Sequence, residues 1–232
     1  MRRALLRVGV LGGTLDPVHV GHLAAARVAS RALALDRVWL VPAHVPALKP
    51  TPGASPWHRF AMAALAAQDE DHIAVSDLEL SRPGPTYTID TLHALAADGY
   101  AASQIFFITG ADAFAGIAAW HRFPDVLDAA HLAVVTRPGH AVPDDVLNHP
   151  AIAPRLSGED PAERAAGADA TGSCRIWLIS ADTPDVSSSE IRERIITGQE
   201  VGTRVPASVA VHIRRHGLYT STKAERRLHG ED

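Results

Sequence analysis

The sequence predicts an α/β fold, a Rossmann-like doubly wound parallel sheet with a small helical part at its C-terminal end. Short apolar runs alternate with segments of helical apolar periodicity along the chain. This alternation is typical of a parallel sheet that is covered by helices on both faces. A glycine-rich turn also separates the first apolar run from the first helical segment, and ligands of such sheets bind beyond the carboxyl ends of the strands.

The elements follow from these patterns in order. The first apolar run, Leu-Leu-Arg-Val-Gly-Val-Leu at residues 5–11, predicts a buried strand, and it ends at two glycines before the first helix. The other expected strands are similar short runs: 38–41, 73–75, 104–109, 131–136 and 175–180. The expected helices are residues 21–34, 57–68, 88–98, 111–118, 124–129, 188–197 and 206–216. Chemistry is therefore expected in the loops after residues 11, 41, 109 and 180.

Length and composition indicate one soluble domain. The 232 residues suit a single domain over 1–219, with a polar tail at 220–232 and a mobile excursion at 157–173 that lacks apolar periodicity. The net charge of −4 argues against a nucleic-acid partner, and no apolar stretch is long enough for a membrane span. The single cysteine, Cys174, excludes an internal disulfide framework. We expect a cytoplasmic protein, and the sequence leaves a homo-oligomer open.

The most informative segment is residues 9–22, which read Gly-Val-Leu-Gly-Gly-Thr-Leu-Asp-Pro-Val-His-Val-Gly-His. Glycines let a backbone approach a ligand closely, and a helix N-terminus offers N–H groups and a positive dipole end to an anion. His19 and His22 stand three residues apart at the expected helix start. Together these features predict a site that handles phosphate groups.

Alternative functions of this loop fit its residues less well. Its glycines do not have the G-x-G-x-x-G spacing of a dinucleotide fingerprint, and no Gly-Lys-Ser/Thr of a P-loop follows. A zinc site needs at least three protein ligands, and no third ligand is evident near His19 and His22. The two histidines could also cap the helix without any chemistry.

The segment closely resembles the signature of the HxGH nucleotidylyltransferases, in the form typical of nicotinate-nucleotide adenylyltransferases. Leu15 stands where that family usually has Phe. The resemblance implies the fold of this superfamily and an ATP site that includes Gly12, Gly13, Thr14, Leu15, Asp16, His19, Gly21 and His22. It assigns catalysis to His19 and His22, with His22 the first choice for transition-state stabilisation.

A lysine follows the second expected strand. Lys49 is one of only two lysines among 22 basic residues, and it matches the Lys of the family's Pro-Pro-His-Lys segment, although Leu48 replaces the His. The resemblance implies that Lys49 is a point charge on a substrate phosphate, with both catalytic and substrate-binding roles. A solvated loop lysine is the alternative.

Three middle segments resemble the nicotinate branch of the family. Thr86, Tyr87 and Thr88 match the segment whose backbone N–H groups hold the pyridine carboxylate, and Thr86 or Thr88 is expected to cap the next helix. Gly110 and Asp112 match residues that contact ATP. Trp120 matches a ring that stacks on nicotinate, and Arg137 matches a substrate contact or a turn-stabilising residue.

The last motif is Ser187-Ser188-Ser189-Glu190-Ile191-Arg192. A serine-rich stretch at a helix start supplies hydroxyl and amide donors for phosphate, and an arginine one turn later can reach the same anion. The resemblance assigns Ser187, Ser188, Ser189 and Arg192 to ATP, with Arg192 also catalytic. It spans about residues 8–219, ending with a segment that resembles the family's closing helix.

The resemblance implies transfer of AMP from ATP to nicotinate mononucleotide, giving nicotinate adenine dinucleotide and pyrophosphate. Mg²⁺ is expected as the cofactor that accompanies ATP, held by phosphates and water and not by a protein cage. Nicotinamide mononucleotide and phosphopantetheine are alternative acceptors, and a class I aminoacyl-tRNA synthetase is disfavoured by the short chain. A nucleotide-binding sensor without turnover is the alternative outside enzymes.

Overall fold

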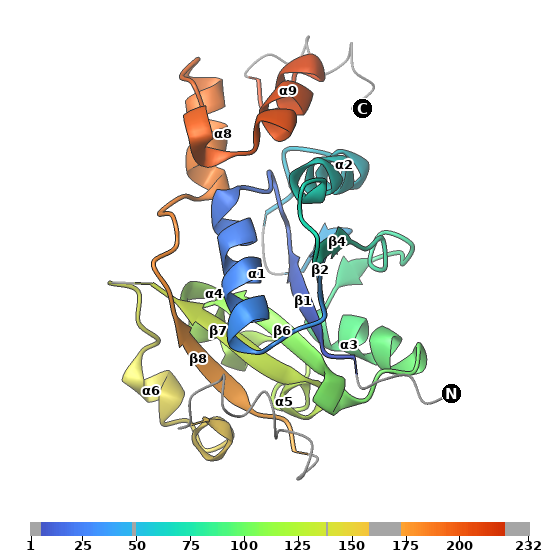
Figure 1. Cartoon of the computed structure of the whole chain (residues 1–232), viewed down its shortest axis with the longest axis vertical. Coiled ribbons are helices and arrows are strands. Elements are labelled where there is room, and N and C mark those ends of the chain that lie inside the picture. Colours follow the sequence, from blue (N-terminus) through green and yellow to red (C-terminus); the bar gives the residue numbers. More distant parts are fainter. Residues whose placement is uncertain (1–5, 48–49, 138, 158–172, 221–232) are drawn as a thin grey trace. The chain divides into compact units, whose positions relative to one another are not determined.

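The protein is described by a computed structural model over residues 6–47, 50–137, 139–157 and 173–220 (Figure 1). One sheet has the strand order β4-β2-β1-β6-β7-β8. Its strands are β1 (Val8–Gly13), β2 (Arg37–Pro42), β4 (Ile73–Val75), β6 (Ile105–Gly110), β7 (His131–Thr136) and β8 (Ile176–Ser180). The chain thus winds outward from β1 in one direction and from β6 in the other. The reversal is a topological switch point next to the ends of β1 and β6, which confirms the predicted doubly wound fold.

The helices also lie close to their predicted ranges. They are α1 (Val20–Ala32), α2 (Pro56–Ala67), α3 (Thr88–Ala97), α4 (Ala111–Ala115), α5 (Val126–Ala129), α6 (Asp144–Leu147), α8 (Ser188–Ile196) and α9 (Ala207–Arg215). Short 3-10 turns add η1 (Ala102–Gln104), η2 (Ile117–Ala119), η3 (Ala153–Arg155) and η5 (Gly202–Arg204).

The chain forms two compact units, each built from discontinuous segments. The first consists of residues 1–12, 25–39 and 87–183, and the second of residues 13–24, 40–86 and 184–232. In the first unit β6, β7 and β8 lie side by side in parallel register, as Figure 1 shows. The core of this unit includes Phe106, Leu132 and Trp177, each at most 1% exposed.

The second unit carries most of the residues predicted to bind phosphate. Its helices α2 and α9 pack against each other, and the Ser208 hydroxyl on α9 donates a 3.0 Å hydrogen bond to the Leu65 carbonyl of α2. Met62, Val209 and Ile213 are buried in this unit. Burial of these apolar faces, and not intrinsic helix propensity, stabilises such short helices.

Some local predictions were wrong or incomplete. The predicted cap of α3 by Thr86 or Thr88 is wrong, because Tyr87 is the N-cap residue and makes no side-chain cap bond. The structure also contains α6 and a small parallel pair, β3 (Val45–Pro46) with β5 (Pro85–Thr86), which were not predicted. The predicted excursion at 157–173 and the tail at 220–232 lie almost wholly outside the described residues. The single-domain boundary stays a prediction.

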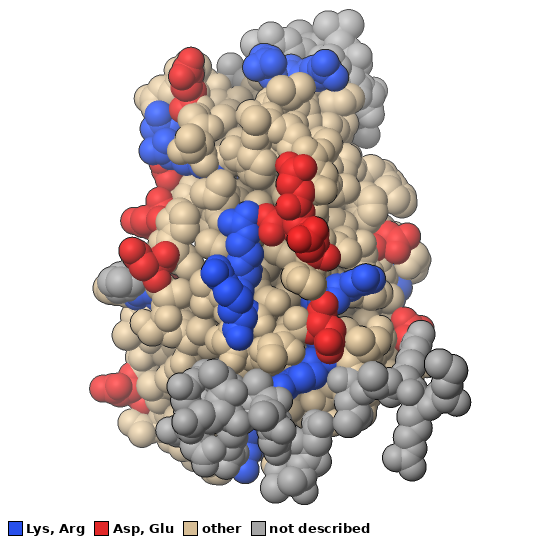
Figure 2. Space-filling model, viewed as in Figure 1, with Lys and Arg blue, Asp and Glu red and all other residues tan. Residues whose placement is uncertain are grey.

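The described surface bears on two expectations about partners. Among the described helices, none has the length and apolar content that crossing a membrane requires. Figure 2 shows acidic and basic side chains intermingled among the described residues on the face drawn, with no continuous basic surface there. The expectation that nucleic acid is not a partner stays a prediction.

Candidate active site

Gly12 and Gly13, the two glycines at the end of β1, have different surroundings. A Cβ atom at Gly12 would lie 3.1 Å from the Phe107 ring, whereas one at Gly13 would meet nothing within 4 Å. Gly12 therefore permits tight packing in the first unit, and Gly13 leaves open space at the backbone. Leu15, which follows in the second unit, has a φ of 51° and is 2% exposed. A left-handed backbone at a leucine costs about 1–2 kcal/mol, so the surrounding loop must hold it there.

The His22 side chain caps the start of α1. The His19 backbone N–H donates to Nδ1 of His22 at 3.1 Å, and the His22 backbone N–H donates to the His19 carbonyl at 3.0 Å. The bond to Nδ1 is one half of a capping box, with an imidazole in place of the usual Glu or Gln, and the second bond is a backbone turn bond. Because Nδ1 of His22 accepts a hydrogen bond, the proton of the neutral ring lies on Nε2. Nε2–H of His22 is therefore a donor suited to an anionic ligand.

The two rings are held close together by the glycine between them. Their centroids are 3.7 Å apart, and His19 is 7% exposed. A Cβ atom at Gly21 would lie 3.0 Å from Nδ1 of His19 and 3.2 Å from Val186. Only glycine therefore fits at this position without displacing the His19 ring.

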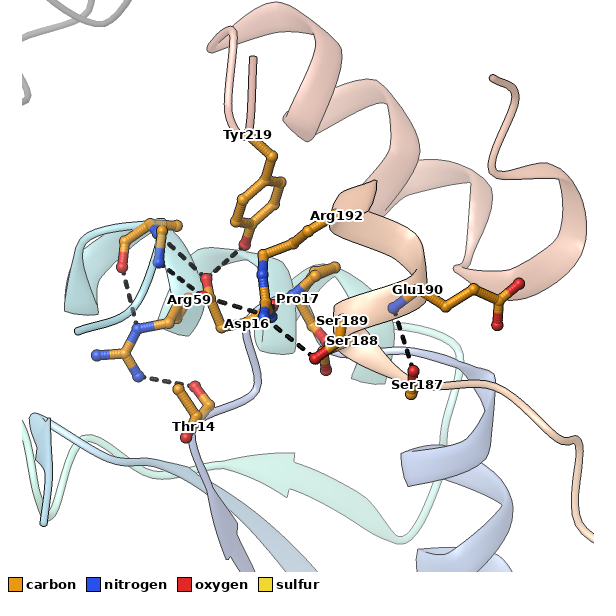
Figure 3. A network of polar contacts seen from close by, with 12 residues as sticks. Thr14, Asp16, Pro17, Arg59, Ser187, Ser188, Ser189, Glu190, Arg192 and Tyr219 are labelled. Carbon is orange, nitrogen blue, oxygen red and sulfur yellow. Dashed lines mark hydrogen bonds and ion pairs between the residues drawn. The ribbon is translucent and has the colours of Figure 1, made fainter. Parts of the chain in front are cut away.

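Asp16 is the centre of a polar network in the second unit (Figure 3). Its carboxylate, 3% exposed, accepts hydrogen bonds from the Gly53 and Ala54 amides at 2.8 and 3.1 Å and from the Tyr219 hydroxyl at 2.7 Å. Burial, followed by the nearby Asp16 charge and hydrogen bond, raises the pKa of Tyr219 well above its usual value. The Asp16 side chain thus holds together three distant segments of this unit. This is a positioning role, and the ATP contact predicted for Asp16 stays a prediction.

The buried side chain of Arg59, on α2, also holds the loop that contains Thr14 and Asp16. Its guanidinium is fully buried and donates to the carbonyls of Ala54, Thr14 and His44, at 3.2, 2.8 and 2.9 Å. Burial is the main cause that lowers the pKa of Arg59. The planar fork of a guanidinium suits three acceptors in fixed directions. Thr14, in the predicted ATP loop, is therefore held by its backbone, and its side chain is not needed for this contact.

The serine motif reaches the same loop. Ser187 caps α8 by accepting from the Glu190 amide at 3.1 Å, which confirms a serine cap at this helix. The Ser188 hydroxyl donates to the Pro17 carbonyl at 2.9 Å, across 171 positions of sequence. Arg192 donates to the Asp16 carbonyl at 2.7 Å and to the Ser189 hydroxyl at 3.2 Å, and its guanidinium lies 3.8 Å from the Asp16 carboxylate. The two end motifs of the sequence therefore meet, as Figure 3 shows.

In the first unit, Gly110 is the N-cap residue of α4, and a Cβ atom there would meet nothing within 4 Å. Asp112 lies in the first turn of α4 with 77% of its side chain exposed. Its carboxylate is 4.0 Å from Arg137 and 3.6 Å from His140. The structure thus brings together two predicted ligand residues, Asp112 and Arg137, and it adds His140.

Tyr87 and Trp120, two predicted ligand residues of the first unit, each contact another aromatic ring. Trp120 is half-buried, and its ring meets Phe107 edge-on at 5.7 Å. Tyr87, the N-cap residue of α3, stacks on the His121 ring with ring centroids 4.1 Å apart. Stacking of Trp120 on a nicotinate ring stays a prediction.

The loop predicted to carry the phosphate-binding lysine begins beside another predicted site segment. Val45 pairs with Pro85 and Pro46 pairs with Thr86 in the β3–β5 sheet. His44 Nδ1 lies 2.8 Å from the Arg82 carbonyl, which can only accept, so Nδ1 carries a proton. Lys49 itself lies outside the described residues, and its role stays a prediction.

Sequence reasoning missed the residues that organise this site from within. Arg59 and the Gly53–Ala54 amides were not singled out, and Tyr219 was noted only as part of the closing helix. One signal was available for Arg59, because it shares the apolar face of α2 with Met62, Ala63 and Ala66 at helical spacing. An arginine on such a face needs partners, since an unpaired buried charge is costly.

The fold and the glycine–histidine loop agree with a family comparison. A family model described as cytidylyltransferase-like matches residues 10–194. Among curated proteins, "Probable nicotinate-nucleotide adenylyltransferase" of Aeromonas hydrophila is 38% identical over 212 residues, covering 91% of this chain and 96% of that protein. A protein of the same name from Roseiflexus sp. is 39% identical, covering 91% and 97%. The chain therefore belongs to the cytidylyltransferase-like family and, within it, to the nicotinate-nucleotide adenylyltransferases.

Solved structures agree on the fold. Nicotinic acid mononucleotide adenylyltransferase of Plasmodium falciparum, complexed with NaAD, has a TM-score of 0.69 to this chain. It is 16% identical, and the match covers 92% of this chain and 97% of that one. The same protein complexed with APC has a TM-score of 0.67 at 17% identity, with the same coverage.

Proposed function

We propose that the protein transfers AMP from ATP to nicotinate mononucleotide, forming nicotinate adenine dinucleotide and pyrophosphate in NAD biosynthesis. The observation that carries the proposal is the meeting of the two end motifs, where Arg192 and Ser188 contact the backbone of Asp16 and Pro17. This contact places the serine-rich start of α8 against the loop that leads to His19 and His22. Such an arrangement gathers imidazole, guanidinium and helix-start donors in one unit, and these are groups suited to a triphosphate.

In the proposed reaction, a phosphate oxygen of nicotinate mononucleotide attacks the α-phosphorus of ATP in line. The bond from that phosphorus to the oxygen bridging to the β-phosphate breaks, and pyrophosphate leaves with the electron pair. The attacking oxygen already carries negative charge, so no general base is required. The protein must orient two anions and stabilise the charge that develops in the transition state.

The described groups suggest a division of this work. His19 and His22, whose ring centroids are 3.7 Å apart, contact the triphosphate, and Nε2–H of His22 is the first choice for stabilising the transition state. Arg192 and the amides at the start of α8 hold the phosphates and the departing pyrophosphate. Asp112 accepts from ribose hydroxyls. The residues that bind the pyridine nucleotide are Thr86, Tyr87, Thr88, Trp120 and Arg137.

Mg²⁺ enters with ATP as part of the substrate. Magnesium keeps several waters and is usually held by one or two carboxylates together with substrate phosphates. In this proposal it is held by phosphate oxygens and water and partly neutralises the charge that two phosphates bring together. A reaction that uses ATP and a nucleotide acceptor also fits a cytoplasmic location, which we propose as part of this function.

The test is pyrophosphate release with ATP and Mg²⁺, comparing nicotinate mononucleotide, nicotinamide mononucleotide and phosphopantetheine as acceptors. We expect strong preference for the nicotinate acceptor and formation of nicotinate adenine dinucleotide. Preference for another acceptor would overturn the assignment of the first unit to the nicotinate ring. ATP binding without release for any acceptor would instead support a nucleotide sensor.

A further inference from the structure

Three histidines form a cluster that the proposed reaction does not use. His58 lies on α2, His212 lies on α9 and His216 is the C-cap residue of α9. Each offers a ring nitrogen, and these nitrogens all lie within 4.8 Å of one another. Within the described residues, this is the group of three histidine, cysteine or acidic side chains that could surround a metal ion.

The local fold holds the three rings in place. His58 lies in the first turn of α2, where its backbone N–H donates to the capping Ser55 hydroxyl at 3.3 Å. His212 and His216 are four residues apart, so α9 presents both on one face. The packing of α2 against α9 then brings the third imidazole to the other two. All three positions belong to the second unit.

The rings already approach one another as ligands would. Nδ1 of His58 and Nε2 of His212 are 3.1 Å apart, and the ring centroids of His212 and His216 are 4.4 Å apart. The 3.1 Å contact is a hydrogen bond, and a metal ion that binds here would displace its proton, because a ligating imidazole nitrogen must be unprotonated.

We propose that His58, His212 and His216 bind one Zn²⁺ ion, with a water molecule as the fourth ligand. Zinc takes nitrogen ligands at about 2.0–2.1 Å in a tetrahedron, which puts neighbouring ligand nitrogens about 3.3 Å apart. The 3.1 Å pair is already near this separation. The remaining nitrogens, all within 4.8 Å, come into range by small ring rotations of half-buried side chains. Three imidazoles without a carboxylate or thiolate suit zinc better than magnesium or calcium, which prefer oxygen ligands.

Such an ion would join two helices that support the candidate active site. His58 directly precedes Arg59, whose guanidinium holds the Thr14 carbonyl. His216 lies three positions before Tyr219, whose hydroxyl donates a hydrogen bond to the Asp16 carboxylate. Zinc would thus be a clamp that fixes α9 on α2 and tightens the support of the Asp16 loop. This role does not depend on the proposed reaction.

The test uses untagged protein freed of metal by a chelator, with Zn²⁺ alone as the probe. Calorimetric titration is expected to give one Zn²⁺ per chain. At a free zinc concentration of a hundred times Kd, the Tm should rise by about 5–10 °C. The His212→Gln variant should bind at least tenfold more weakly, since even outer-shell changes cost about 10–100-fold in metal affinity. Its Tm should therefore rise at most about half as much at the same zinc concentration.

His93→Gln is the matched control, because His93 is an exposed histidine outside the cluster, and it should behave as the wild type does. Equal binding by wild type and His212→Gln would overturn the proposal and point to other histidines, such as the pair His19 and His22. Absence of saturable binding by the wild type would overturn it too. If His212→Gln does not fold without metal, His58→Gln and His216→Gln each carry the same prediction. No substrate is present in this assay, so its failure would leave the proposed reaction untouched.

Discussion

At the residue scale, the hydrogen bond that His22 accepts determines what its ring can do. Nδ1 is engaged by the His19 backbone N–H at 3.1 Å, so the remaining nitrogen is a donor. A cap and a phosphate donor are therefore compatible functions of one side chain. The two roles of the histidine pair that the sequence leaves open, helix capping and chemistry, do not exclude each other.

His22→Ala should lower kcat by about 10²–10³, the cost typical of losing one donor that stabilises transition-state charge. Steady-state pyrophosphate release measures this. Because alanine also removes the cap, His22→Gln serves as a control, since glutamine at this helix position can accept from the same N–H. It should recover the Tm while kcat stays at least tenfold low. A loss under tenfold for His22→Ala would contradict the assigned role.

Tyr219→Phe should lower the free energy of unfolding at pH 8 by about 1.5–3 kcal/mol, because the 2.7 Å bond to the buried Asp16 carboxylate is lost. Its pH dependence follows from the raised pKa of Tyr219. Below about pH 10 the Tyr219 hydroxyl is protonated in both the folded and the unfolded chain, so its hydrogen bond makes its full contribution to the free energy of unfolding. Above about pH 10, Tyr219 loses its hydroxyl proton in the unfolded chain but keeps it in the folded protein, so the free energy of unfolding of the wild type falls.

The difference in unfolding free energy between wild type and Tyr219→Phe should therefore shrink as the pH rises above about 10, by up to about 1.4 kcal/mol per pH unit. Urea unfolding of both proteins at a series of pH values from 8 to 11 measures it. A difference that is constant over this range would show that Tyr219 ionises equally in both states.

At the element scale, the start of α1 and the interior of α2 show how helices position the loop. Gly21 is needed in α1 because of the His19 ring, and Arg59 is needed in α2 because three carbonyls converge on it. Glycine is unfavourable within a helix, but the His19 ring leaves no room for a side chain at Gly21. An arginine is unfavourable in a core, but three backbone carbonyls accept hydrogen bonds from Arg59.

Gly21→Ala tests the packing at the start of α1. Helix propensity alone predicts a gain of about 1 kcal/mol, but the new Cβ would lie 3.0 Å from Nδ1 of His19. We expect kcat to fall at least tenfold while the Tm changes little. Gly116→Ala is the control, because its Cβ would meet nothing nearer than the Ala113 carbonyl at 3.8 Å. Wild-type kcat in Gly21→Ala would contradict the packing argument.

Arg59→Lys tests the guanidinium fork. A lysine ammonium cannot reach three carbonyls in these directions, so we expect a loss of about 2–4 kcal/mol in unfolding free energy, measured by urea unfolding. Arg31→Lys, on the exposed surface of α1, should stay within about 0.5 kcal/mol of the wild type. Similar values for the two variants would mean that Arg59 acts only as a charge.

At the scale of the whole molecule, the sequence predicts what is local or periodic and misses what depends on distant partners. Helices and strands with clear apolar patterns lie within a few residues of their expected ranges. The β3–β5 pair, only two residues per strand, exists because Val45 meets Pro85, forty positions away in sequence. Arg59 likewise becomes a site residue only when the carbonyls of Thr14 and His44 reach it. The histidine pair was predicted because its signal is contiguous.

Most of the residues predicted to bind the triphosphate and most of those predicted to bind the pyridine nucleotide belong to different units, which makes a kinetic prediction. Most residues assigned to ATP, within 13–22 and 187–192, belong to the second unit, whereas Tyr87, Thr88, Trp120 and Arg137, assigned to the pyridine nucleotide, belong to the first. The exceptions are Thr86, a substrate residue in the second unit, and Gly12, Gly110 and Asp112, ATP residues in the first. A change at Trp120 and a change at a triphosphate residue of the second unit should therefore affect different substrates.

Trp120→Ala should raise KM for nicotinate mononucleotide at least tenfold more than KM for ATP, because stacking of an aromatic ring contributes about 1–3 kcal/mol per base. Trp120→Phe, which keeps a flat ring, should recover most of the affinity. Trp57→Ala is the matched control in the second unit, since Trp57 is 67% exposed and assigned to neither substrate. Initial rates with each substrate varied in turn measure both constants. Equal increases in the two KM values for Trp120→Ala would mean that the ring maintains the first unit through its contact with Phe107 and does not bind the nicotinate ring.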